Sequence, residues 1–482
     1  MIRPMALLMM ITLAGCAVRS KYRVAEVKVP AAYTQARGQQ TQTAGELAEW
    51  WKSFGDRTLS SLIERTIQNN LDVQVAKARL LEARATFKST DVGKRLPSGN
   101  WNFNYAQART STDNPQIPRF GGGTLIPTTY NSYQSYLDAS YELDLFGGVR
   151  HQVAAARADA QSYEESLRNT LVSVVAEVAR DYMQLRQYQE QLEVARRTEA
   201  SRTETLRITE VRHRAGLVTE VDVANAAASV AQAQASIPGL KASALQMMHA
   251  IGVLVGEQPS TLTHELQELA PIRLAPAGIP VGLPSELLLR RPDIRQAERS
   301  LAAAIARVDV QRANLFPSFS LTSQYGGQTG QALNLVNAAA RFYTLGPQIK
   351  WGLLNYPAAK AGIKTYEARR EQQYLTYQKT VLTAFQDVEN ALASHRANRE
   401  RLTALEQQAL QLRNASDLAM HRYTHGLTNF LEVLDAQRAL NNAEDLSAQC
   451  RGAVNVDVVS LYKALGGGWE RNDPVPQSRV LD

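Results

Sequence analysis

Apolar residues in the first half of the chain recur with an average spacing of 3.5 residues. The spacing holds over thirteen positions between Val153 and Ala195, and it is the heptad repeat that packs helices side by side in a left-handed supercoil. No proline interrupts residues 148–214, so the pattern predicts one helix about 100 Å long at 1.5 Å per residue. The apolar positions are Val153, Ala156, Ala160, Tyr163, Leu167, Leu171, Val174, Val178, Tyr182, Leu185, Tyr188, Leu192 and Ala195.

The same helical pattern returns 210 residues later in the chain. The segment 212–217 recurs at 422–427, with Gly216 matching Gly426, and the heptad spacing recurs over about 360–424. Because glycine commonly ends a helix, each of these glycines predicts a reversal into a second helix, over 218–254 and 428–465. An internal duplication of this kind indicates two copies of one structural unit. We therefore expect two helical hairpins whose turns lie at the same end.

Four other segments alternate apolar and polar residues with the two-residue period of strands. They cover about 97–109, 132–146, 317–326 and 342–352, and a loop joins the two members of each pair, at Thr110 to Tyr130 and at Gly326 to Arg341. Their length and alternation suit tilted membrane strands, with two ordinary soluble hairpins as the alternative. Four strands cannot close a barrel, since the smallest membrane barrels have about eight, so the membrane interpretation requires an oligomer. Two copies would supply eight strands and three would supply twelve, and periodicity does not choose between them.

The predicted fold is mainly α with a membrane β-barrel part, internally duplicated, with four strands and two long helical hairpins per chain. Shorter helices, over 58–93 and 285–315, precede the first strand of each copy. The expected organisation is a signal peptide at 1–15, a lipidated N-terminal segment at 16–57, a first repeat at 58–256, a Pro-rich linker or equatorial segment at 257–284, a second repeat at 285–469 and a mobile tail at 470–482.

The N-terminus has the features of a secretory signal. Arg3 precedes a short apolar core, Met5 to Leu13, which is too short to span a bilayer. The core ends in Leu13-Ala14-Gly15-Cys16, which resembles the bacterial lipobox, so we expect a covalent lipid such as palmitate on Cys16 and no other cofactor. The alternative is an ordinary signal with a chance cysteine. Ala17 does not resemble the inner-membrane retention signal, and we therefore expect the outer membrane of a Gram-negative envelope.

Charge and cysteine content exclude several other classes of protein. The net charge of +7 is spread over helical faces with acidic residues between the basic ones, which favours a solvated surface over a nucleic-acid site. Only Cys450 remains beside Cys16, so no intrachain disulfide is expected once Cys16 is lipidated. We find no nucleophile elbow, HExxH zinc motif or Walker loop. We therefore expect neither an enzyme nor a metalloprotein.

Four groups of residues are typical of one protein family: 283–294 (LPSELLLRRPDI), 461–469 (LYKALGGGW), Trp50-Trp51 with Phe54, and 434–438 (LDAQR). In these segments the chain resembles the outer-membrane efflux channel family of the TolC and OprM type, in its lipoprotein branch. The resemblance covers essentially the whole mature chain and implies a homotrimer, with twelve strands forming an outer-membrane pore and twelve helices forming a periplasmic tunnel. It also implies docking onto a periplasmic adaptor, or membrane fusion, protein and an inner-membrane RND-type transporter, with export of drugs, metals or other small toxic compounds.

The turns at Gly216 and Gly426 carry the candidate functional residues. Leu431 and Asp435 lie four residues apart on one helical face, and by resemblance Leu431, Asp435 and Arg438 belong to the periplasmic aperture. There Leu431 would form an apolar constriction and three Asp435 carboxylates a cation-binding ring. The alternative is a surface aspartate paired with Arg438. The matching positions in the first copy, Val221 and Asn225, carry no charge.

Two further groups of residues lie at the same turns. We assign Gly216, Leu217, Gly426 and Leu427 to adaptor contact, although glycine would also be needed simply to end each helix. His421 and His425 stand four apart and could share a metal ion, but no third ligand is evident, which favours an ordinary pair on a helical face. A lipid-anchored adaptor or coiled-coil tether without a pore is the alternative function, since it would also show long heptad hairpins.

Overall fold

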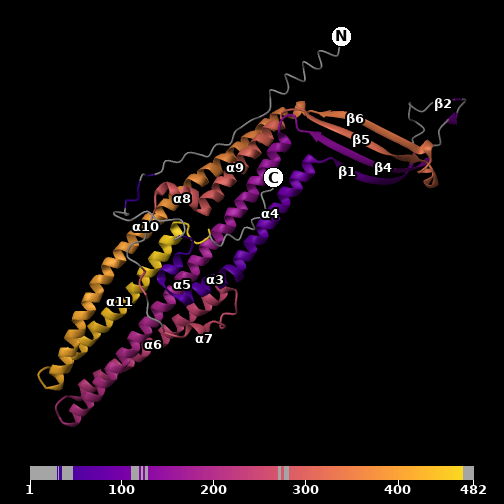
Figure 1. Ribbon diagram of the computed structural model, residues 1–482. Coiled ribbons are helices and arrows are strands. Elements are labelled where there is room, and N and C mark those ends of the chain that lie inside the picture. Colours follow the sequence, from indigo (N-terminus) through magenta and orange to yellow (C-terminus); the bar gives the residue numbers. More distant parts are fainter. Residues whose placement is uncertain are drawn as a thin grey trace. The chain divides into compact units, whose positions relative to one another are not determined.

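A computed structural model describes residues 30, 32–34, 47–109, 119–120, 123–124, 129–269, 273–275 and 282–470 (Figure 1). The predicted signal peptide, Cys16, most of the Thr110 to Tyr130 loop, parts of the Pro-rich linker and the tail after Glu470 lie outside these residues. The described chain divides into two compact units. One contains 81–162 and 298–376, and the other contains the described parts of 26–80, 163–297 and 377–470. Each unit therefore draws on both repeats.

Four long helices occur where the heptad spacing predicts them (Figure 1). α5 (Gly148–Arg214) has 67 residues and reverses into α6 (Glu220–Val255). α10 (Tyr356–Thr424) has 69 residues and reverses into α11 (Phe430–Ala464). None of the described helices combines the length and the hydropathy that a helical membrane span requires.

The core of the second unit repeats the duplication of the sequence. Leu171 on α5 and Val381 on α10 match at the 210-residue offset, and both side chains are fully buried. Val178 and Val388 match in the same way and are also fully buried. Burial of such side chains, at about 1.5–3 kcal/mol each, stabilises long helices more than intrinsic propensity does. The repeated apolar positions therefore mark the inward face of each helix.

The two shorter helices are each broken in two, which corrects the predicted spans 58–93 and 285–315. The first span forms α3 (Arg57–Asn69) and α4 (Leu71–Arg95), and the second forms α8 (Pro284–Arg290) and α9 (Pro292–Ala313). At the first break the Asn70 side chain accepts a hydrogen bond from the Val73 N–H and donates to the Leu254 carbonyl, which competes with helical bonding. At the second, Pro292 disfavours a helical conformation for Arg291, which has φ −70° and ψ 120°.

The first unit contains an antiparallel sheet in the strand order β1-β4-β5-β6. Its strands are β1 (Ser98–Arg109), β4 (Thr129–Leu143), β5 (Ser318–Thr329) and β6 (Arg341–Lys350), within three residues of the predicted bounds. β4 ends before the predicted residue 146 because the Asp144 carboxylate accepts hydrogen bonds from the Val149 and Arg150 N–H groups of α5. A second pair, β2 (Arg119–Phe120) and β3 (Gly123–Thr124), follows β1.

The register of the sheet gathers apolar side chains on one face. Trp101 is opposite Leu137, Leu137 is opposite Tyr325, and Tyr325 is opposite Tyr343, so these four side chains form one row across all four strands. Their exposed fractions are 72%, 55%, 60% and 81%. The neighbouring row on the other face is polar and consists of Asn100, Asp138, Gln324 and Thr344. The chain by itself therefore leaves a large apolar sheet face uncovered.

Shorter elements join the longer ones. They are η2 (Trp50–Phe54), α7 (Thr263–Leu266), η3 (Ala332–Asn334), η4 (Ala338–Ala340) and η5 (Leu353–Asn355). In the first unit, Phe146 stacks on Phe316 at 4.7 Å between ring centroids. Phe146 follows β4 and Phe316 precedes β5, so this contact packs the two repeats together at one end of these strands.

Candidate functional site at the helical turns

Both long helices end in the same glycine-dependent turn. Gly216 has φ 72° and Gly426 has φ 75°, a left-handed conformation that side chains rarely adopt. The Leu217 N–H donates to the Arg212 carbonyl and the Gly216 N–H to the His213 carbonyl, which is the hydrogen-bond pattern of a Schellman cap. The turn after α10 has the same two bonds at the 210-residue offset. The repeated sequence therefore encodes a repeated backbone conformation.

Side chains at the return helices fix where each turn ends. Thr219 caps α6 in a reciprocal arrangement with Asp222, and Asn429 caps α11 by accepting from the Glu432 N–H. Caps of this type contribute about 1 kcal/mol each. Thr219 and Asn429 also match at the 210-residue offset. Each reversal therefore occupies only a few residues between two defined helix ends.

A small apolar cluster holds the two turns together. The buried residues Ala226, Tyr423, Phe430, Val433 and Leu434 form its centre, and the rings of Tyr423 and Phe430 meet edge to face at 6.0 Å. Because α6, α10 and α11 all contribute to this cluster, the ends of the two hairpins form one packed unit.

Arg212 links the first turn to the second. Its guanidinium lies 4.6 Å from the centroid of the Tyr423 ring, donates a short hydrogen bond to the Tyr423 carbonyl and donates a second to the Thr424 carbonyl at 3.3 Å. The Tyr423 hydroxyl donates to Thr209 Oγ1 at 3.3 Å. Charged donors make the stronger class of protein hydrogen bond. The carbonyls at the end of α10 are thus satisfied by an arginine of α5.

The predicted aperture residues lie on the exposed face of α11. Leu431 is 57% exposed, and Asp435 and Arg438 are exposed as well, whereas Val433, Leu434 and Gln437 are buried on the other face. Among the described residues no ion pair joins Asp435 to Arg438, the pairing that the alternative interpretation expected. Val221, the counterpart of Leu431, is also exposed. The aperture role itself stays a prediction.

The predicted contact residues also face outward. Leu217 is 66% and Leu427 is 67% exposed, and a Cβ added at Gly216 would meet no atom within 4 Å. With Val221 and Leu431 they place four exposed apolar side chains around the two turns. Clustered exposed apolar residues mark contact surfaces more often than isolated ones do.

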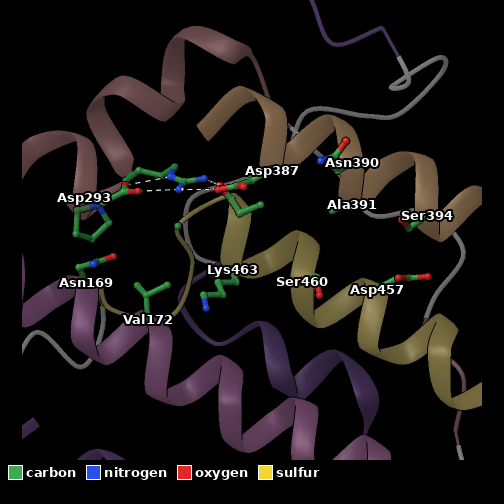
Figure 2. Close-up of a pocket in the computed structure, with 14 residues that line it drawn as sticks. Asn169, Val172, Asp293, Asp387, Asn390, Ala391, Ser394, Asp457, Ser460 and Lys463 are labelled. Atoms are coloured by element: carbon green, nitrogen blue, oxygen red, sulfur yellow. Dashed lines mark hydrogen bonds and ion pairs between the residues drawn. The ribbon is translucent and has the colours of Figure 1, made fainter. Parts of the chain in front are cut away.

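A cavity of about 470 Å³ lies elsewhere in the same unit (Figure 2). Beside it the buried Arg291 guanidinium donates to both Asp293 carboxylate oxygens, at 3.0 and 2.7 Å, and to Asp387 at 3.1 Å. It also donates to the Ala464 carbonyl at 2.9 Å. Burial alone would lower the pKa of Arg291, but the two carboxylates raise it. Asp457, at the other end of the cavity in Figure 2, has a pKa raised by burial.

Comparison with known proteins identifies the family. A family model described as outer membrane efflux protein matches residues 62–257 and 283–467. The pyoverdine export outer membrane protein OpmQ of Pseudomonas aeruginosa is 33% identical over 429 residues, 89% of each chain. The solvent efflux pump outer membrane protein SrpC of Pseudomonas putida is 30% identical over 473 residues, 97% of this chain and 98% of SrpC. The solved outer-membrane channel OprN matches with a TM-score of 0.87 at 33% identity, covering 94% of this chain and 100% of OprN.

The chain belongs to the outer membrane efflux protein family. It is an efflux channel of the Gram-negative outer membrane, as the sequence predicts. The family consists of channels and not of enzymes. The tether alternative receives no support from these relatives.

The segments that carry the family resemblance pack against one another in this efflux channel. Trp50 stacks on Tyr462 at 5.1 Å between ring centroids, and Arg291 donates a hydrogen bond to the Ala464 carbonyl. Arg295, directly after the 283–294 segment, lies 5.4 Å from the ring centroid of Trp469. Three segments far apart in sequence thus meet at one place in the fold. The sequence contained these residues, but no spacing rule indicated that they would meet.

Sequence reasoning also missed the link made by Arg212 and Tyr423. Both lie inside the repeated segments 212–217 and 422–427, so the repeat pointed to the right turns. The link itself is asymmetric, since Arg212 has a counterpart in Arg422 whereas Tyr423 matches His213. The difference between Tyr423 and His213, within two otherwise repeated turns, was the one sequence signal that could have indicated this link.

Proposed function

We propose that three copies of this chain form a continuous, passive exit duct, through which an inner-membrane transporter drives small toxic compounds or drugs. The four-stranded sheet carries this proposal. In the described chain β1 and β6 each have one edge without a strand partner, and the apolar row through Trp101 and Tyr343 is exposed. Unpaired backbone groups in lipid cost several kcal/mol each. Edge-to-edge pairing of three copies removes that cost and gives a twelve-stranded barrel.

In this trimer the apolar row faces lipid and the polar row faces the lumen. The long helices of each copy, α5, α6, α10 and α11, then supply a twelve-helix tunnel that continues the duct through the periplasm. OpmQ is named for pyoverdine and SrpC for solvents, so relatives of similar identity serve chemically different compounds. A polar duct of this kind selects little, and selection belongs to the transporter.

The periplasmic aperture of this duct is formed by Leu431, Asp435 and Arg438. Three Leu431 side chains form an apolar constriction, and three Asp435 carboxylates form a ring that binds cations and, by mutual repulsion, favours opening. The exposure of Leu431 and Asp435 and the absence of an Asp435–Arg438 ion pair among the described residues support this assignment.

The turns are the docking points for a periplasmic adaptor protein, which connects the channel to an RND-type inner-membrane transporter. Leu217 and Leu427 supply exposed apolar contacts to the adaptor. Gly216 and Gly426, which have no side chain, leave the backbone of each turn accessible to it. At the other end of the chain, a lipid on Cys16 anchors the mature protein to the outer membrane, because several acyl chains bind firmly at about 0.8 kcal/mol per buried methylene.

Single-channel conductance in a planar bilayer tests the proposal. We expect the purified wild-type protein to show a small, cation-preferring conductance, and Leu431→Ala combined with Asp435→Ala to show a larger one with weaker cation preference. Asp435→Ala alone should reduce the preference without the same widening, and unchanged selectivity would refute the acidic ring. If neither protein conducts although both are trimeric by mass, the duct itself is wrong and a tether becomes the better account.

A further inference from the structure

Two histidines lie together at the C-terminal end of α10, His421 in its last turn and His425 directly after it. His421 and His425 are exposed, and their rings stack with centroids 4.4 Å apart and an interplanar angle of 29°. Residues four apart on a helix have Cβ atoms about 6 Å apart, so their side chains can reach a common ligand. Imidazole nitrogens bind zinc-like ions at about 2.0–2.1 Å. The helix therefore presents two metal-binding groups side by side to solvent.

The backbone fixes the protonation of one ring. His425 Nδ1 lies 2.8 Å from the carbonyl oxygen of His421, and because a carbonyl can only accept, Nδ1 carries the proton. In the neutral imidazole this leaves the Nε2 lone pair free. Donation from the non-ligating nitrogen to a carbonyl is the usual outer-shell arrangement of metal-binding histidines, and it orients the ring. His425 is thus already in the tautomer and orientation that a metal requires.

The second ring is free to adjust. In the described chain no hydrogen bond holds the His421 ring to another residue, and the χ2 torsion of histidine is broad. An ion held at His425 Nε2 would have the His421 ring beside it, since the two ring centroids are 4.4 Å apart. No group of three or more His, Cys, Asp or Glu side chains gathers anywhere among the described residues. Water must therefore complete the coordination.

Local electrostatics contain both favourable and unfavourable contributions. α10 ends at Thr424, so the pair lies at a helix C-terminus, where cations are favoured by about 0.3–1 kcal/mol. Asp417, one turn before His421, is exposed and adds negative charge on the same side of the helix. Two arginines place positive charge near the pair and so oppose the binding of a metal cation. They are Arg422 on this helix and Arg212, which donates a hydrogen bond to the Thr424 carbonyl.

We propose that His421 and His425 form a two-imidazole site for a divalent transition metal, with Cu²⁺ bound more tightly than Ni²⁺ or Zn²⁺. The order follows the general affinity of nitrogen ligands for first-row metals. The site does not depend on the proposed duct, because binding requires only the folded turn.

Copper titration of the full-length, tag-free protein in detergent tests this site. We expect one tight Cu²⁺ per chain by calorimetry and an electron paramagnetic resonance spectrum with hyperfine splitting from two nitrogens. His421→Asn and His425→Asn should each weaken binding at least tenfold, since loss of an outer-shell partner alone costs about 10–100-fold. His264→Asn is the matched control, because His264 is exposed on α7 and has no histidine four residues away.

The possible outcomes distinguish a failure of the proposed metal site from a failure of the proposed duct. Unchanged Cu²⁺ affinity in the His421→Asn, His425→Asn double variant would overturn the proposal, as would a spectrum with a single nitrogen. Circular dichroism and the trimer mass of each variant check that the turn still folds. Binding that persists in a protein that conducts no ions would refute the duct and leave the metal site standing.

Discussion

Arg212→Gln tests whether the link between the two turns restrains opening of the proposed periplasmic aperture. The substitution removes the guanidinium from the Tyr423 ring and from the Tyr423 and Thr424 carbonyls. The glutamine side chain is too short to replace these contacts. Arg214→Gln makes the same change of charge two residues away, on an exposed side chain, and serves as the control.

The structure sets the expected magnitude. A cation over an aromatic ring contributes about 0.5–1 kcal/mol at an exposed site, and a hydrogen bond from a charged donor about 1.5–3 kcal/mol. Arg212 is only half-buried, so we take the low end of both ranges. We count the ring contact and one hydrogen bond, because the bond to the Thr424 carbonyl is long at 3.3 Å, and obtain about 2 kcal/mol. If the link exists only when the turns are together, its loss shifts the open-to-closed ratio about 30-fold, at about 1.4 kcal/mol per tenfold change.

Open probability in planar-bilayer recordings measures this shift. We expect Arg212→Gln to open far more often than wild type, and Arg214→Gln to behave as wild type. Tyr423→Phe should have a small effect, because it keeps the ring and both carbonyls and loses only the 3.3 Å bond to Thr209. Equal open probabilities for Arg212→Gln and Arg214→Gln would refute the argument that this link restrains opening.

Three other predictions concern stability and docking. Arg291→Met should destabilise the fold by about 1.5–3 kcal/mol, because it removes the charged hydrogen bonds that the buried guanidinium donates to the partly exposed carboxylates of Asp293 and Asp387. Arg290→Met, which loses a 4.0 Å contact to Glu286, should cost under about 1 kcal/mol, and thermal denaturation followed by circular dichroism compares the two variants. Burial lowers the pKa of His395, so its contribution to stability is lost as the pH falls below the unfolded value of about 6.5, and denaturant titrations from pH 8 to pH 5 should show a smaller loss for His395→Gln than for wild type. Leucine at both Gly216 and Gly426 should abolish export in cells while trimers persist, and more so than alanine, which carries the same φ strain with less bulk; loss of trimers with either residue would mean that these glycines only end helices.

Much of the architecture was predictable from periodicity. The 3.5-residue spacing and the repeated glycines located α5, α6, α10 and α11 within about four residues, because heptad burial and positive φ are strong local constraints. Strand alternation located β1, β4, β5 and β6 within three residues. Two segments were each predicted as one continuous helix, although each is broken in two, because the breaks at Asn70 and Arg291 depend on side-chain bonding to distant helices and on the residue before a proline. These breaks do not change the spacing of the apolar residues, so the apolar pattern could not reveal them.

By itself the sequence determined the period of each element, the duplication and the positions of the turns, because these follow from contacts within a few residues along the chain. Tertiary structure decided which side chains meet. Arg212 reaches the carbonyls of Tyr423 and Thr424 across more than two hundred residues, and Arg291 reaches Asp387 and Ala464. These contacts depend on the packing of whole helices, where burial makes each unpaired charge costly, so only the folded chain assembles them.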